Sequence, residues 1–244
     1  TVIDRHRAMG RPLYICFIDF KRAFECVNRN LMFYKIITKG YKGKIVQLMR
    51  NMYSKTKSQV KLKGRLSELF PTTRGVGQGG ILSPFLFKNF LSDLVNHLSK
   101  QYGVWLDEET ILTHLLWADD LILFANSPYD LQCQLDLLYS YTKKWQMIVN
   151  TTKTKVMCFP KTLEKDTKVY LNEKLIEICS QYKYLGCIVS NENRYHFHKH
   201  INHAEQQYHK ALYKLKSYTN AFGFFPPQLS IELFDSMVLP VLEY

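Results

Sequence analysis

The segment THLLWADDLILFA (residues 113–125) places two adjacent aspartates, Asp119 and Asp120, between two apolar arms. Apolar arms around a short polar centre are typical of a strand, a tight turn and a second strand, so we expect both acids at a hairpin tip. Two carboxylates ~4 Å apart repel by about 4 kcal/mol at an effective dielectric of about 20. The segment contains no Lys or Arg. An octahedral Mg²⁺, held by one or two carboxylates and by substrate phosphates, would neutralise the pair, whereas an ordinary Asp-rich turn is the alternative for this segment alone.

A second acid follows the run LYICFID (residues 13–19), which is almost continuously apolar. Such a run is typical of a central strand covered on both faces, so Asp19 is expected where that strand emerges at the end of the sheet. A carboxylate at this position would complete a two-metal site with the acid pair. In such a site one ion activates an attacking hydroxyl and the other stabilises the leaving oxygen.

Positive charge is concentrated in a basic tract from Cys26 to Ser67, which has eleven Lys and Arg residues and no Asp or Glu. The whole chain carries 33 basic and 21 acidic residues, a formal net charge of +12. Tyrosines interleaved with cations are typical of surfaces that hold single strands and A-form duplexes, so we expect a polyanion partner. A solvated Lys-rich surface is the alternative. The residues expected to contact nucleic acid are Lys55, Lys57, Lys61 and Lys63.

The remaining pattern predicts further elements. Residues 30–53 should be helical with a break at Gly40, and SQVKLKG (residues 58–64) alternates like a half-exposed strand. Ser83-Pro84 and Ser127-Pro128 should each cap and start a helix, the first over residues 85–98 and the second to about residue 146. Short strands should then follow, with a helical stretch over residues 196–219 and a last helix after a double proline.

Several ligand and membrane classes are disfavoured. The six cysteines form no C-x-x-C pair and indicate buried thiols, and four histidines between residues 196 and 203 lack the Glu of a zinc helix. The GVGQGG glycines lack the strand and the distal acid of a dinucleotide site. Since no apolar run approaches the ~18 residues of a membrane span, we expect a soluble, intracellular chain that does not act at a membrane.

Five segments in order resemble motifs A to E of reverse transcriptases, most closely those of non-LTR (LINE-type) retrotransposons. They are FIDFKRAFE (residues 17–25), GVGQGGILSP (75–84), WADD (117–120), VNTTKTKVMCF (149–159) and YLG (184–186). The resemblance implies an α+β right-hand polymerase palm, an antiparallel sheet with helices packed on one face, followed by a partial helical thumb. The expected division is a palm with residual fingers elements over residues 1–190 and a thumb over residues 191–244. Since few residues precede Asp19, the fingers segment is expected to be largely missing.

The resemblance also implies residue roles. Asp19, Asp119 and Asp120 would bind two Mg²⁺ ions, with Mn²⁺ as a substitute, and Lys153 would be the general acid toward pyrophosphate. Phe20 would offer its backbone amide to the triphosphate, and Phe24 would exclude a 2′-hydroxyl. Gln78 and Gly79 would line the nucleotide pocket, and the primer grip would be Tyr184, Leu185 and Gly186. Trp117 and Gly77 depart from the usual family residues, which are an aromatic Tyr or Phe and often an Arg.

The expected activity is RNA-directed DNA polymerisation, with an RNA template, a DNA primer, the RNA/DNA hybrid and deoxynucleoside triphosphates as partners. Whether the chain has protein partners is not determined by the sequence. One alternative is a catalytically inactive remnant that only binds nucleic acid, which the short segment before Asp19 favours. The other is an intron-maturase-type reverse transcriptase with the same chemistry. The three intact aspartates favour the polymerase.

Overall fold

A computed structural model describes residues 1–192 and 195–243 of the chain. The chain divides into two compact units, Thr1–Ile178 and Cys179–Tyr244. The sequence places the palm–thumb division at residue 190, whereas the compact units divide before the last hairpin, because strand β15 (Cys187–Ser190) packs against helix α7 (His198–Phe222). The assignment of palm and thumb roles to the units stays a prediction.

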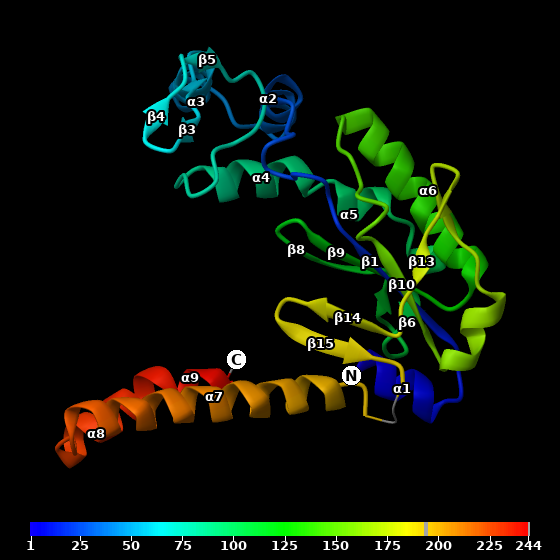
Figure 1. The fold of residues 1–244 in the computed structure, drawn as a ribbon. Coiled ribbons are helices and arrows are strands. Elements are labelled where there is room, and N and C mark those ends of the chain that lie inside the picture. The colour runs from blue at the N-terminus through cyan, green and yellow to red at the C-terminus, as the bar shows by residue number, and fades with distance from the viewer. Residues whose placement is uncertain (193–194, 244) are drawn as a thin grey trace. The chain divides into compact units, whose positions relative to one another are not determined.

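The first unit is built on a five-stranded sheet in the order β13-β10-β1-β9-β8 (Figure 1). Strand β1 lies at its centre and is buried along its whole length, as its apolar run predicts. Its neighbours β9 and β10 are antiparallel to it, and β8 is antiparallel to β9, whereas the short β13 runs parallel to β10. The strands are β1 (Leu13–Ile18), β8 (His114–Trp117), β9 (Asp120–Ala125), β10 (Lys155–Phe159) and β13 (Glu177–Ile178).

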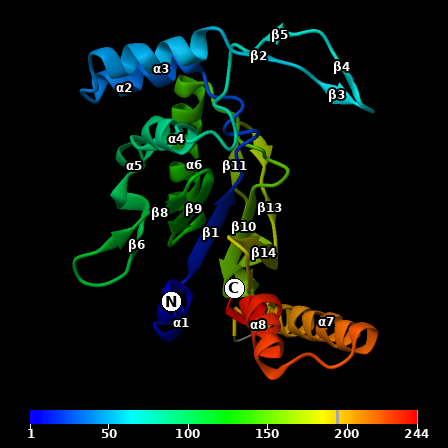
Figure 2. The same cartoon turned by 90° about the vertical axis from the view of Figure 1, so that its left-hand side faces the viewer.

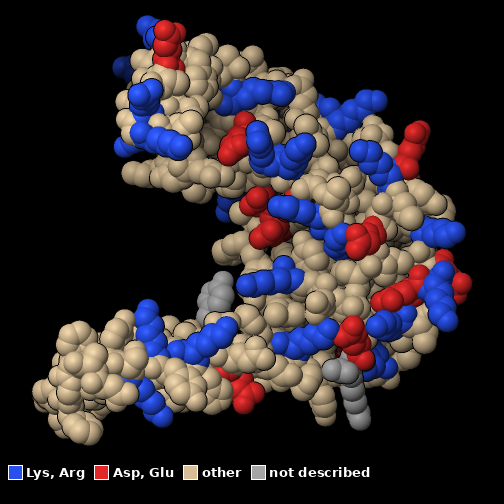
Figure 3. All heavy atoms as spheres, in the orientation of Figure 1, with Lys and Arg blue, Asp and Glu red and all other residues tan. Residues whose placement is uncertain are grey.

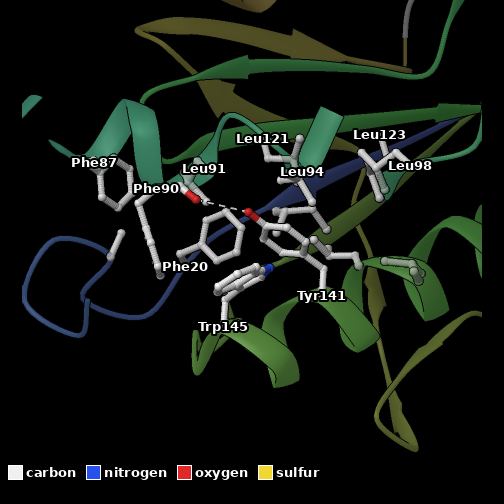
Figure 4. Packing of buried hydrophobic residues seen from close by; sticks show 14 of the residues in the cluster. Phe20, Phe87, Phe90, Leu91, Leu94, Leu98, Leu121, Leu123, Tyr141 and Trp145 are labelled. Carbon is white, nitrogen blue, oxygen red and sulfur yellow. Dashed lines mark hydrogen bonds between the residues drawn. The ribbon is translucent and has the colours of Figure 1, made fainter. Parts of the chain in front are cut away.

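Helices pack against the sheet through one large apolar cluster. Helix α6 (Pro128–Trp145) starts at its predicted N-cap, Ser127, and packs against β1 and β9. Helices α4 (Ser83–Leu91) and α5 (Leu94–His97) contribute to the same cluster, and Figure 4 shows their side chains meeting those of α6. The predicted α+β class with a mainly antiparallel sheet is therefore confirmed.

The helix predicted over residues 85–98 is wrong in two details. It is broken after Leu91 into α4 and α5, and the N-cap position of α4 is Leu82 rather than Ser83. The Ser83 hydroxyl donates a hydrogen bond back to the Gly77 carbonyl, so it does not cap the helix. The serine instead ties the start of α4 to the glycine-rich segment before it.

The half-exposed strand predicted over residues 58–64 is also wrong. The chain forms two small ribbons in which β2 pairs with β5 and β3 pairs with β4. Val60 and Leu62 are 57% and 70% exposed, so the apolar side of this pattern is not buried. Both views show the ribbons lying apart from the five-stranded sheet (Figure 1, Figure 2). The strands are β2 (Lys57–Ser58), β3 (Lys61–Leu62), β4 (Arg65–Leu66) and β5 (Phe70–Pro71).

The other elements of the first unit are short. The helix pair predicted over residues 30–53 is present as α2 (Arg29–Thr38) and α3 (Lys44–Ser54), with Gly40 in the break at φ +92°. The remaining helices are α1 (Val2–Ala8) and the 3₁₀ turns η1 (Lys100–Tyr102) and η2 (Lys161–Asp166). The remaining strands are β6 (Val104–Trp105), β7 (Ile111–Leu112), β11 (Tyr170–Leu171) and β12 (Lys174–Leu175).

In the residues of the second unit that the structure describes, one hairpin is combined with three helices. Strand β14 (Gln181–Tyr184) pairs with β15, and α7 contacts α8 (Pro227–Met237) and α9 (Leu239–Glu243). The predicted break before the last amphipathic helix is confirmed, because α8 starts at the second proline of the pair. Across residues 1–192 and 195–243, no helix is long and apolar enough to cross a membrane.

Candidate active site

The sheet register brings the three predicted carboxylates to one end of the sheet. The last pair between β1 and β9 joins Ile18 to Leu121, so one further step sets Asp19 opposite Asp120. The β8–β9 hairpin closes at the pair Trp117–Asp120, which leaves Ala118 and Asp119 as its two-residue turn. The predicted hairpin with both acids at its tip is therefore confirmed.

The pKa of the Asp120 carboxyl group also indicates that the three aspartates lie near one another. Partial desolvation raises the pKa of its carboxyl group, and the negative charges of Asp119 and Asp19 raise it further. Like charges raise a carboxyl pKa in this way when they lie close together. A cation at this end of the sheet would relieve the repulsion.

The carboxylates do not form a closed metal cage. Within the described part of the chain, no three or more His, Cys, Asp or Glu side chains stand close enough to hold a metal ion by themselves. This donor set fits Mg²⁺ in the form it takes with nucleotide substrates, where one or two carboxylates, substrate phosphates and waters share the coordination. Among the described residues, the histidines of residues 196–203 belong to no group of three or more metal-ligating side chains.

The backbone around Asp19 is held by the segment of residues 150–154, of which the sequence motifs indicate only one residue. The Asp19 N–H donates to the Thr154 hydroxyl oxygen at 3.2 Å, and the Asp19 carbonyl accepts from the Asn150 N–H at 2.7 Å. The motif resemblance indicates Lys153 in this segment but not its neighbour Thr154, which is fully buried. A small polar residue directly before strand β10 is the sequence signal for this position.

Two phenylalanines follow Asp19 with different environments. The Phe20 side chain is buried in the core, where Figure 4 shows it near Phe90 and Trp145, so only its backbone is available to a ligand. Phe24 is half-buried and stacks on Phe87 with ring centroids 4.2 Å apart. It lines a cavity of about 670 Å³ that the acid hairpin also borders, through Trp117 and Ala118 among others.

The glycine-rich segment packs directly on the backbone between Phe24 and Val27. The Val76 N–H donates to the Phe24 carbonyl at 2.9 Å, and the Gly75 N–H donates to the Val27 carbonyl at 2.8 Å. Gly75 has φ +81°, and a Cβ there would lie 2.6 Å from the Glu25 carbonyl oxygen, so this close approach requires glycine.

The other predicted site residues lie on exposed turns. Gln78 and Gly79 are exposed in the turn before α4, and Lys153 is exposed while its N–H donates to the Asn150 carbonyl at 3.2 Å. Tyr184, Leu185 and Gly186 form the end and the turn of the β14–β15 hairpin in the second unit. Leu185 and Gly186 both have positive φ, the geometry of a tight hairpin turn. The roles of these residues stay predictions.

Not every cation of the basic tract faces solvent, which corrects the view of the tract as one surface. Arg29 donates to the carbonyl oxygens of Gly75 and Tyr53 at 2.7 and 2.9 Å, and Lys39 donates to the Asn89 carbonyl. Lys35 is buried. Lys35 is therefore enclosed by the protein and Arg29 is half-buried, whereas Lys39 stays exposed although it hydrogen-bonds to a backbone carbonyl.

The other end of the tract is open to a partner. Lys55, Lys57, Lys61 and Lys63 are all exposed. Figure 3 shows basic side chains gathered over the part of the molecule that carries the ribbons β2–β5. This surface fits the polyanion contact expected from the sequence.

The cysteines agree only in part with the sequence expectation. All six are free thiols, and Cys16 and Cys158 are buried, as predicted. The other four are half-buried. Burial raises the pKa of the Cys158 thiol to about 11, so this group is an unreactive core residue.

Solved structures of telomerases have a fold similar to that of this chain. The structure of apo telomerase from Candida tropicalis, truncated from its C-terminal domain, aligns over 78% of this chain and 38% of its own, with a TM-score of 0.52 and 20% identity. Telomerase from Candida tropicalis in complex with the TWJ fragment of telomeric RNA aligns over 99% of this chain and 41% of its own, with a TM-score of 0.55 and 17% identity. These likenesses show a palm-like polymerase fold.

The sequence comparison places the chain within one family. The family model "Reverse transcriptase (RNA-dependent DNA polymerase)" matches residues 3–189, so the chain belongs to the reverse transcriptase family. The RNA-directed DNA polymerase from mobile element jockey of Drosophila melanogaster is 24% identical over 93% of this chain. The Pol polyprotein from type-1 retrotransposable element R2 of Nasonia vitripennis is 28% identical over 78% of it. The predicted resemblance to non-LTR retrotransposon enzymes is confirmed. The chain spans 25% and 20% of the length of these two relatives.

Proposed function

We propose that this chain carries the catalytic core of an RNA-directed DNA polymerase, which extends a DNA primer on an RNA template by two-metal nucleotidyl transfer. The convergence of Asp19 with Asp119 and Asp120 at one end of the sheet carries the proposal. The raised pKa of the Asp120 carboxyl supports it, because the negative charges of Asp119 and Asp19 add to the effect of desolvation and a cation would offset them. Family membership supports the choice of reaction.

The residues would divide the reaction between them. Asp19 and Asp119 would hold Mg²⁺, or Mn²⁺ in its place, with Asp120 beside them. The bound ions would activate the primer hydroxyl and stabilise the developing charge on the triphosphate. The exposed Lys153 ammonium would donate a proton to the departing pyrophosphate. Phe20 would offer its backbone N–H to the triphosphate, while its side chain stays buried in the core.

The nucleotide and the primer would be positioned by the glycine-rich turn and by the second unit. Gln78 and Gly79 would line the nucleotide pocket, and Tyr184, Leu185 and Gly186 would contact the primer. Since the substrates are RNA, DNA and deoxynucleoside triphosphates, the proposal places the activity inside a cell.

A primer-extension assay tests the proposal directly. The purified chain is incubated with an RNA template, an annealed DNA primer, the four deoxynucleoside triphosphates and Mg²⁺, and the products are sized. Extension that stops when any one nucleotide required by the template is withheld would support the proposal. Tight binding of the primed template without extension, in either Mg²⁺ or Mn²⁺, would contradict it and favour a nucleic-acid-binding role.

Phe24→Ala should raise ribonucleotide incorporation relative to deoxyribonucleotide incorporation by about tenfold or more. The half-buried ring that stacks on Phe87 would no longer occupy the space into which a 2′-hydroxyl projects. Single-nucleotide incorporation kinetics with both sugars measure the ratio. Phe24→Tyr keeps the ring and should keep the selectivity, and an unchanged ratio in Phe24→Ala would show that another residue excludes the 2′-hydroxyl.

Replacing the exposed Lys55, Lys57, Lys61 and Lys63 by Gln should weaken RNA binding and flatten its salt dependence. Each lysine that contacts a phosphate contributes about 0.7 to the slope of log affinity against log salt on single-stranded RNA. Fluorescence anisotropy over a salt series measures this slope. Gln substitution of four exposed lysines elsewhere, Lys161, Lys165, Lys168 and Lys174, removes the same charge. An equal change in both variants would refute a specific role for the ribbons.

A further inference from the structure

We infer that Thr154 is a positioning residue for the metal ligand Asp19, and that its hydroxyl oxygen sets the affinity of the carboxylate site for divalent metal. The inference rests on the proposed function in one respect, the assignment of Asp19 as a ligand. It adds a residue that acts through the backbone of Asp19 and does not touch metal or substrate.

Asp19 lies just beyond the last residue of β1 that pairs with a neighbouring strand. The ladder between β1 and β9 ends at the pair Ile18–Leu121, and the ladder between β1 and β10 ends at Phe17–Lys155. After Asp19 and Phe20 the chain turns into a loop, in which Arg22 has a φ of +49°. The carboxylate is therefore attached to a backbone position beyond the last strand pair on both sides.

Beyond the end of β1, the segment of residues 148–154 supplies the hydrogen bonds that a neighbouring strand would otherwise make. Its Thr154 side chain accepts the Asp19 N–H at 3.2 Å, and its Asn150 N–H donates to the Asp19 carbonyl at 2.7 Å. One residue further on, the Lys21 N–H donates to the Ile148 carbonyl at 2.8 Å. Three hydrogen bonds thus fix the backbone on both sides of the Asp19 side chain, and one of them depends on a side chain.

The hydrogen bond between the Asp19 N–H and the Thr154 hydroxyl oxygen is shielded from water. Thr154 is fully buried, so water does not compete for its hydroxyl oxygen. A backbone N–H that loses its acceptor at such a place must move or stay unpaired, and either result disturbs the position of the attached carboxylate. Partners that orient a metal ligand typically change metal affinity or activity by 10- to 100-fold when they are removed.

The same turn also carries the candidate general acid. The N–H groups of Lys153 and Thr154 both donate to the Asn150 carbonyl, at 3.2 and 2.9 Å. Asn150 therefore contacts the backbone of Asp19 through its N–H and the backbone of Lys153 through its carbonyl. One turn sets the position of the metal ligand and of the lysine expected to protonate pyrophosphate, so loss of the Thr154 contact should affect both.

The test compares three threonine variants of the whole chain. Thr154→Val keeps the branched shape and removes the acceptor, whereas Thr154→Ser keeps the acceptor. Thr142→Val is the matched control, because Thr142 is also buried but its hydroxyl donates to the Tyr139 carbonyl within its own helix. Binding of Mn²⁺ to the protein is measured by electron paramagnetic resonance with a deoxynucleoside triphosphate but no primer, because phosphates complete the coordination of the ion. Asp19→Asn is the reference for a lost ligand. Hydrogen exchange of the peptide that contains Asp19 is measured in parallel.

Thr154→Val should weaken Mn²⁺ binding about tenfold and speed exchange at Asp19, whereas Thr154→Ser and Thr142→Val should stay within about threefold of the parent. Parent-like Mn²⁺ affinity in a folded Thr154→Val variant would overturn the inference, and so would equal losses in Thr154→Val and Thr142→Val. If Thr154→Val does not fold, parent-like affinity and exchange in Thr154→Ser support the inference, and a tenfold loss in that variant overturns it. Because these readouts need no primer extension, an inactive parent that shows the expected Mn²⁺ pattern would contradict the proposed function alone.

Discussion

Replacing Asp119 by asparagine is expected to lower the rate of primer extension by about 10³-fold while it leaves the fold and the RNA affinity almost unchanged. The amide has the size of the carboxylate but no charge, so it removes a metal ligand rather than a packing contact. Asp119 lies in the two-residue turn of the acid hairpin, where the substitution disturbs no strand pair. Loss of its charge also removes one of the two carboxylates that raise the pKa of Asp120.

Extension kinetics at saturating template, with circular dichroism and RNA-binding titrations beside them, measure this result. Asp136→Asn is a matched control, because it makes the same change at an exposed position on α6. The control should retain the parent rate. A rate for Asp119→Asn within tenfold of the parent would contradict the two-metal assignment, and an equal loss of RNA affinity would indicate that the substitution damages the fold.

The carboxylate site could be predicted from the sequence because local patterns determine it. The apolar run before Asp19 requires a buried strand, and the apolar arms around Asp119 and Asp120 require a hairpin. Both patterns place acids at strand ends, and the register then brings them together. The other candidate residues around the three aspartates were predicted from the order of the five reverse transcriptase motifs. The small polar residue before β10 marks the position of Thr154, but its role depends on a contact with Asp19, which is far away in the sequence, so the role could not be predicted.

The basic tract shows why the rest could not be predicted. Lys35 has the same local sequence surroundings as its exposed neighbours, yet it is buried. Its partners Asp93 and Tyr141 are supplied by the α4–α5 junction and by α6, far away in the sequence. The alternation of Val60 and Leu62 predicted a strand with a buried side, but burial requires a second layer, and both side chains are exposed.

Replacing Lys35 by methionine should lower the free energy of unfolding by about 3 kcal/mol, because it breaks a mostly buried ion pair and leaves the other partner uncompensated. The Lys35 ammonium contacts Asp93 and donates to the Phe90 carbonyl and the Tyr141 hydroxyl. It also lies 3.6 Å from the centroid of the Trp145 ring, a favourable cation–π position. Methionine fills the volume but replaces none of these contacts.

Urea unfolding at several pH values measures this loss of unfolding free energy. The pH dependence separates the effect of burying Lys35 from the effect of its ion pair with Asp93. Lys42→Met, at an exposed position of the same tract, should keep a free energy of unfolding close to that of the parent.

Burial lowers the pKa of Lys35 from 10.5 to about 8, although Asp93 opposes the shift. Between these two pKa values the unfolded chain keeps the lysine proton and the folded chain releases it, so this group makes the protein more stable as pH rises. The stability advantage of the parent over Lys35→Met should therefore grow from pH 8 toward pH 10.5. An advantage that shrinks over this range would mean that the pair with Asp93 outweighs burial and that Lys35 keeps its charge more firmly in the folded protein than in the unfolded chain.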